Sequence, residues 1–184
     1  MNIQLIRVAA LSAFFCAVAA GATESSLIPT PQPNGTPAPR GTAVRYVQEC
    51  GSCHMPFPAE FLPERSWRKL MAGLQNHFGD NAELAPEDAR VVLDHLVQNA
   101  SDRTWSRMRT MTRGLPPEEV PLRISELPYF IGRHRTVPHK VVAGNPDIKS
   151  FSRCQACHTR AESGSFHDRE IRIPGYDWAE DELD

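Results

Sequence analysis

The feature that most constrains this chain is a five-residue pattern, C-x-x-C-H, which occurs twice, as CGSCH at 50–54 and as CQACH at 154–158. This pattern is the attachment sequence for a c-type haem. Its two thiols add to the two vinyl groups of one haem and form thioethers. The histidine that follows is placed beneath the iron as an axial ligand. Two copies therefore predict two covalently bound haems c.

The cysteines support this interpretation, because the two patterns contain every cysteine outside the N-terminal apolar segment: Cys50, Cys53, Cys154 and Cys157. Two disulfides are an alternative in an exported protein. A zinc ribbon is another, but its C-x-x-C pairs lie about 15–20 residues apart. Here about 100 residues separate the two pairs. Neither alternative explains why a histidine directly follows both pairs.

The N-terminus has the pattern of a secretory signal peptide over residues 1–22. Arg7 forms a basic n-region, an apolar run follows from Val8 to Ala20, and Ala20-Gly21-Ala22 fits a cleavage site. An uncleaved membrane anchor is the alternative, but the run is shorter than the roughly 20 residues that a spanning helix needs. The sequence therefore predicts export to the periplasm and a mature chain without a membrane span.

Composition and breaker residues divide the rest of the chain. With 41% hydrophobic and 23% charged residues it is globular, and a formal net charge of −2 gives no support for binding nucleic acid. No sustained strand periodicity occurs, so we expect an all-α fold with long loops. The predicted parts are a Pro-rich linker at 23–41, a first, cytochrome c-like haem unit at 42–100, a basic bridging helix within 101–120, and a second, irregular haem unit at 121–184.

Helical spacing and turn residues predict the elements within these parts. They are a short helix ending at Cys50, a helix from Ser66 to about Phe78, a helix from Pro86 to about Asn99, a helical stretch over 102–113, two helical turns over 127–134, a helix over 151–162, and an extended segment over 166–174.

For the first haem, His54 supplies one axial ligand and we favour His77 for the other. On the predicted helix His77 shares the apolar stripe of Leu70 and Leu74, which would direct it into the haem pocket. The alternative for His77 is a histidine simply packed in the core. His95 and Met71 are weaker candidates for the ligand, and Met71 suits core packing better.

For the second haem, His158 supplies one ligand and we favour His134, which shares an apolar stripe with Phe130 and Ile131. That stripe covers only two turns, so His139 and His167 stay open as alternatives. The second ligand decides what each haem does. A closed bis-histidine site suits electron transfer, whereas an open site permits ligand binding or peroxide chemistry.

Four arginines lie in the bridging segment: Arg103, Arg107, Arg109 and Arg113. They could neutralise haem propionates or contact an acidic partner. A solvated helix face is the alternative for such a charge run.

Several stretches beyond the two patterns resemble the bacterial dihaem cytochrome c family of exported electron carriers. They are SWRKLM at 66–71, NHFG at 76–79, PYFI at 128–131 followed by His134, GSF at 164–166 and IRIPG at 171–175. The resemblance covers roughly 42–175. It implies two low-spin haems with two histidine ligands each, no catalytic residues, and electron exchange with another haem protein. Small oxygen-binding cytochromes and membrane cytochromes b are the partners that the family implies.

Two haems within one small mature chain must lie close together, so electron transfer without a substrate is the leading hypothesis for function. A small dihaem peroxidase or oxidase is the alternative, and a haem-based sensor is a third possibility. Both would need one open or displaceable iron site.

Units this small bury too little surface to fold alone, so the haems should form part of the core. We expect haem-free protein to be largely unfolded, as measured by circular dichroism during heating. A cooperative, native-like thermal transition in haem-free protein would contradict this.

Overall fold

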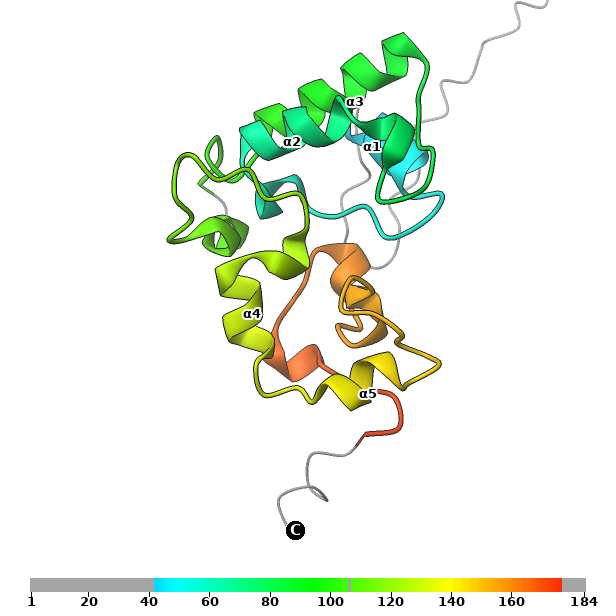
Figure 1. Cartoon of the computed structure of the whole chain (residues 1–184), viewed down its shortest axis with the longest axis vertical. Helices are drawn as coiled ribbons and strands as arrows, with labels where there is room; N and C mark the ends of the chain where they lie inside the picture. Colours follow the sequence, from blue (N-terminus) through cyan, green and yellow to red (C-terminus); the bar gives the residue numbers. More distant parts are fainter. Residues whose placement is uncertain (1–41, 106, 177–184) are drawn as a thin grey trace, which may run out of the picture. The chain divides into compact units, whose positions relative to one another are not determined.

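The computed structural model describes residues 42–105 and 107–176 (Figure 1). The predicted signal peptide at 1–22, the Pro-rich linker at 23–41 and the acidic C-terminal tail lie outside these residues. None of the described helices is both long enough and apolar enough to cross a membrane.

The described chain is helical, as predicted, and its β-structure is limited to two isolated bridges. Its five α-helices are α1 (Thr42–Cys50), α2 (Glu64–Met71), α3 (Pro86–Gln98), α4 (Pro128–His134) and α5 (His139–Ala143). Short 3-10 helices interrupt the loops at Ala59–Phe61, Leu74–Asn76, Arg107–Thr112, Ile124–Glu126, Cys154–Ala156, Ala161–Ser163 and Asp168–Glu170.

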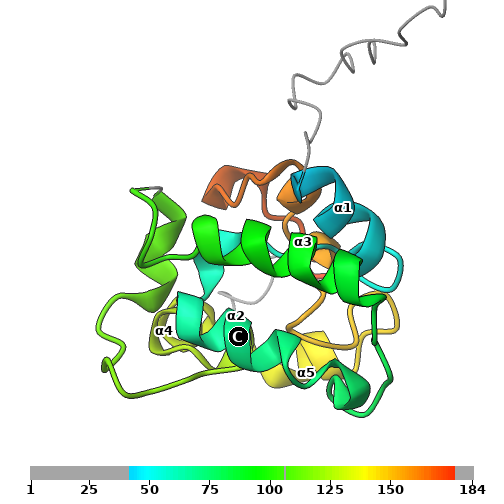
Figure 2. The same ribbon diagram turned by 90° about the horizontal axis from the view of Figure 1, so that it is seen from above.

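Helix α3 packs against both α1 and α2 and lies between them in Figure 2. It begins at Pro86, which suits the first turn of a helix, and Glu87 and Asp88 complement the helix dipole there. Its limits agree with the helix predicted from Pro86 to about Asn99. Val92 and Leu96 are the buried residues of this helix.

The larger hydrophobic core is built from both halves of the described chain. Leu62, Trp67, Val92 and Leu96 pack in the same cluster as Ile124, Leu127 and Phe130. A second, smaller cluster contains Val142, Ile148 and Ile173. The first core therefore extends beyond the segment 42–100 and depends on residues that follow the bridging segment.

The helix predicted from Ser66 to Phe78 is shorter and begins earlier. Pro63 precedes its first residue, Glu64, whose backbone N–H has no acceptor within the helix and donates to Asp102 Oδ1 at 2.9 Å. Ser66 is buried inside the first turn and caps nothing. The helix ends at Met71, and a 3-10 turn replaces its predicted last two turns.

Two further helix predictions were wrong. The stretch over 102–113 contains only the 3-10 helix Arg107–Thr112 within its described residues. The stretch over 151–162 contains 3-10 turns, because its backbone pairs with a later segment: Arg172 N–H donates to Cys157 O at 2.8 Å, and Thr159 N–H donates to Glu170 O at 3.3 Å. The segment predicted as extended over 166–174 contributes these contacts, although Asp168–Glu170 forms a 3-10 turn.

Replacing the buried Leu62 tests the shared core. Leu62 is 1% exposed, so we expect Leu62→Ala to lower the free energy of unfolding by about 2–5 kcal/mol. Chemical denaturation of the haem-loaded protein measures this change. Leu122 is a matched control, since it is half-buried and belongs to neither cluster. An equal loss in Leu122→Ala would show that Leu62 has no special place in the core.

Candidate functional site

Two pairs of histidines face each other in the described structure. The ring centroids of His54 and His77 lie 6.3 Å apart, with an angle of 16° between the ring planes. Those of His134 and His158 lie 6.1 Å apart, with an angle of 73°. Each pair joins the histidine of one C-x-x-C-H pattern to the histidine that we favoured as its second ligand.

These distances suit two imidazoles on opposite sides of one metal ion. Two metal–nitrogen bonds of about 2.0–2.1 Å and two ring radii of about 1.2 Å give a centroid separation of about 6.4–6.6 Å. No group of three or more histidine, cysteine or acidic side chains that could hold a metal occurs in the described part of the chain. A metal between either pair would therefore need most of its ligands from a cofactor, as the four nitrogens of a haem provide.

The end of α1 carries the first C-x-x-C-H pattern. Cys50 is the last residue of the helix, and Gly51 N–H donates to Val47 O at 2.9 Å. A Cβ atom at position 51 would lie 2.3 Å from Val47 O, which is too close for any side chain. The glycine thus allows the chain to turn tightly between the helix and His54.

The His54 ring is oriented by a backbone carbonyl. Its Nδ1 lies 2.7 Å from Met55 O. A carbonyl can only accept, so Nδ1 carries the proton and Nε2 keeps its lone pair for a metal. The Phe57 ring lies beside it, with the ring centroids 5.1 Å apart.

His77 lies in a tight turn and not on a helix. His77 N–H donates to Asp80 O at 2.7 Å, and Asp80 N–H donates to His77 O at 3.2 Å. Both central residues have positive φ, 58° at Phe78 and 111° at Gly79, as the two-residue turns of β-hairpins require. Phenylalanine rarely adopts this conformation. The Phe78 ring packs edge-on against the His77 ring. The Arg123 guanidinium lies over the Phe78 ring, 4.1 Å from its centroid.

The environment of His77 favours a neutral ring. Burial is the main cause that lowers its pKa, and the facing His54 adds to the effect. Nδ1 of His77 is buried without a hydrogen-bond partner among the described residues. Neutral imidazole is the form that binds metals.

His134 is the last residue of helix α4. Its Nδ1 lies 2.8 Å from Phe130 O, one turn earlier, which again leaves Nε2 free for a metal. The Phe130 ring stacks on the imidazole at 3.9 Å between centroids, and the Phe151 ring packs edge-on at 5.9 Å. The two phenylalanines hold the imidazole in an apolar setting.

His158 follows the 3-10 turn Cys154–Ala156 and is held by the bridge to Ile171. Burial is the main cause that lowers its pKa, and the facing His134 adds to it. Its Nδ1 is buried without a hydrogen-bond partner among the described residues. Phe166 lies beside this ring at 5.4 Å and also contacts Phe61 at 5.2 Å between centroids.

The four cysteines of the two patterns are free, so they form no disulfides in the structure. Burial raises the pKa of Cys50 and of Cys154 to about 11, and it raises that of Cys157 as well. These thiols are therefore protonated at neutral pH, which makes them poor metal ligands as they stand.

The other candidate ligands lie elsewhere. His95 stacks on Tyr46 at 5.2 Å between ring centroids, and Met71 packs against the larger core. His139 and His167 are exposed. The phenylalanines beside the histidines, namely Phe57, Phe78 and Phe166, were not predicted as site residues, although each lies within a few residues of a histidine.

The bridging arginines are engaged away from the histidine pairs or exposed. Arg103 forms an ion pair with Glu64 at 2.5 Å, and the Arg109 guanidinium lies 4.6 Å from the ring centroid of the exposed Trp105. Arg113 is exposed, and the side chain of Arg107 lies outside the described structure.

Comparison with known proteins gives matches to both sequence and structure. A family model for dihaem cytochromes c matches residues 46–166. A dihaem cytochrome c from Shewanella baltica OS155 is 37% identical with a TM-score of 0.62, over 74% of this chain and 97% of that one. A dihaem cytochrome c from Rhodobacter sphaeroides is 43% identical with a TM-score of 0.60, over 66% of this chain and 94% of that one. No curated protein matches.

The ring angles of the two pairs predict two different electron paramagnetic resonance signals. If each pair ligates one haem iron, each imidazole would donate π-electron density to the iron orbital perpendicular to its ring. Rings near parallel, as in the first pair at 16°, separate the two iron π-orbitals, whereas rings at 73° keep them close in energy. We therefore expect one rhombic low-spin ferric signal and one highly anisotropic signal with a dominant low-field feature. Two identical signals would contradict these ring orientations.

Proposed function

Because this chain belongs to the dihaem cytochrome c family, whose two haems c are its cofactors, we propose that it carries electrons between redox partners in the periplasm. Each haem iron changes reversibly between the ferric and ferrous states. No substrate is bound or converted, and the protein positions the haems and sets their potentials. The observation that carries the proposal is the pair of opposed histidines at each of the two sites.

We assign the first haem to Cys50 and Cys53 through thioether bonds, with His54 and His77 as axial ligands. The carbonyl of Met55 fixes the tautomer of His54, and such outer contacts make a ligating imidazole more basic. The turn at 77–80 holds the second ligand by its backbone.

We assign the second haem to Cys154 and Cys157, with His158 and His134 as axial ligands. The choice of His134 over His139 and His167 is supported by its position opposite His158, since the other two are exposed. The apolar rings of Phe130 and Phe151 pack against His134, and that of Phe166 packs against His158.

A carrier is favoured over a peroxidase, an oxidase or a gas sensor, because each of those needs an open iron position. A histidine stands opposite the pattern histidine at both sites, which supports six-coordinate irons. Other haem proteins are the partners we propose, either small oxygen-binding cytochromes or cytochromes of the b type. Export by the N-terminal signal would bring the chain to the periplasm, where it could meet such partners.

Optical spectra of the haem-loaded protein test this function. We expect two low-spin haems whose spectra do not change when carbon monoxide is added to the ferrous protein or cyanide to the ferric protein. Rapid binding of either ligand at one haem, or a high-spin signal at rest, would favour an enzyme or a sensor instead.

Single substitutions test the ligand assignment. His77→Ala and His134→Ala should each convert one of the two haems to a high-spin form that binds carbon monoxide. His95→Ala and His167→Ala are matched controls, because these histidines face neither His54 nor His158, and both haems should stay low-spin. A His77→Ala or His134→Ala protein with two unchanged low-spin haems would overturn that assignment.

A further inference from the structure

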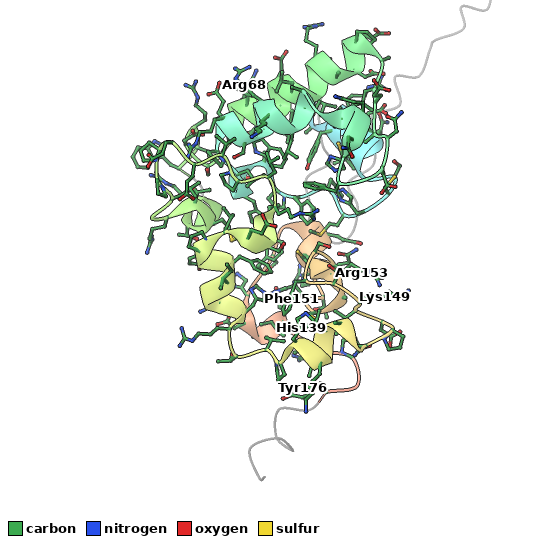
Figure 3. The ribbon with its side chains drawn as sticks, in the orientation of Figure 1. Arg68, His139, Lys149, Phe151, Arg153 and Tyr176 are labelled. Carbon is green, nitrogen blue, oxygen red and sulfur yellow. The ribbon has the colours of Figure 1, made fainter. Side chains whose placement is uncertain are left out.

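A cavity of about 500 Å³ opens beside His134. Phe130, Val142 and Phe151 are among the apolar residues that line it. Three cationic or titratable side chains also line it, and these are Arg135, His139 and Lys149. His139, Lys149 and Phe151 are labelled in Figure 3. No aspartate or glutamate belongs to the lining, so the cavity combines an apolar wall with a positively charged rim.

The three rim side chains are exposed and form no ion pair with a described carboxylate. Two other arginines of the second half differ in this respect. Arg133 contacts Asp168 at 2.7 Å, and Arg160 lies 3.8 Å from Glu170. The charge at the rim therefore lacks a counterpart within the part of the protein that the structure describes.

The backbone at Lys149 adds a second observation. Its φ of 66° lies in the left-handed region, which a lysine seldom occupies. Lys149 N–H donates to Asn145 O at 2.9 Å, and the preceding Ile148 is buried in the smaller core. The surrounding structure thus holds the lysine in an unfavourable conformation, as is common where a residue is positioned for function.

We propose that Arg135, His139 and Lys149 bind the propionate carboxylates of the second haem. A haem has an apolar macrocycle with two carboxylates at one edge. The cavity is lined by His134 but not by His158, Cys154 or Cys157, so it offers an apolar wall and a cationic rim only on the His134 face of this haem. Carboxylates that enter a protein need charged or hydrogen-bonding partners, and arginine and lysine are the usual ones. The inference rests on the assignment of His134 as a ligand of this haem.

In this assignment the bridging arginines do not neutralise the propionates of the second haem. Arg103 is already paired with Glu64, and Arg109 contacts Trp105. The assignment also gives His139 a function other than axial ligation, because a side chain at the rim can donate to a carboxylate.

Lys149→Gln tests the proposal, with Lys140→Gln as a matched control. Both substitutions remove one exposed lysine charge, but Lys140 lies outside the lining of this cavity. A cation near the iron favours the ferrous state. We therefore expect Lys149→Gln to shift the reduction equilibrium of one haem about three- to tenfold toward the ferric form, or about 28–59 mV for one electron. Lys140→Gln should change it much less, and Lys149→Arg should restore the wild-type value.

Resonance Raman spectra of the same proteins give a second readout, because the propionate bending band shifts when a carboxylate loses a donor. The band should move in Lys149→Gln and stay in place in Lys140→Gln. Equal shifts in both variants, or none in either, would overturn the proposal. An unchanged band and potential in Lys149→Gln, with slower oxidation by anionic ferricyanide, would also overturn it and show that the rim contacts acidic partners. Wild-type spectra with carbon monoxide test the ligand assignment separately, so the two failures can be told apart.

Discussion

An imidazole binds iron only when the lone pair of one nitrogen points at the metal, and the surroundings of the paired histidines are arranged to meet that condition. In each pair a backbone carbonyl accepts from Nδ1 of one ring, Met55 O for His54 and Phe130 O for His134. The remaining nitrogen of that ring is then the acceptor. Burial keeps the facing rings of His77 and His158 neutral by lowering their pKa. Helix ends, turns and bridges in the chain serve to bring these four rings into opposition.

The shared core explains how a chain with so few long helices can hold two such pairs. Ile124, Leu127 and Phe130 pack with residues of α2 and α3, and Phe130 is also the residue that supports His134. The packing of the first half is therefore linked through Phe130 to the second histidine pair. A haem at each site would add a large apolar surface to clusters that are small by themselves.

The parts of the site that depend on local chemistry could be predicted from the sequence. The C-x-x-C-H pattern by itself predicts covalent haem attachment. The helix from Pro86 is predicted by its first-turn residues and by the helical spacing of its apolar residues. His77 was favoured because of its place on a predicted helical stripe, and that helix was wrong, since His77 lies in a turn. The turns around His158 could not be foreseen, because they depend on hydrogen bonds with a segment about a dozen residues later: Cys157 O accepts from Arg172 N–H, and Thr159 N–H donates to Glu170 O. The local sequence of residues 151–162 favours a helix and gives no indication of that pairing.

The hydrogen bonds to Nδ1 also make the two sites unlike in how firmly each ring is held. In the first site the ring bonded to a carbonyl belongs to the C-x-x-C-H pattern itself, so His54 carries two restraints and His77 has only its turn. In the second site the bonded ring is His134, while His158 carries the covalent anchor. Restraint is thus concentrated on one face of the first haem and divided between both faces of the second. With the proposed ligands, exchange of an axial ligand would accordingly begin on the His77 face of the first haem.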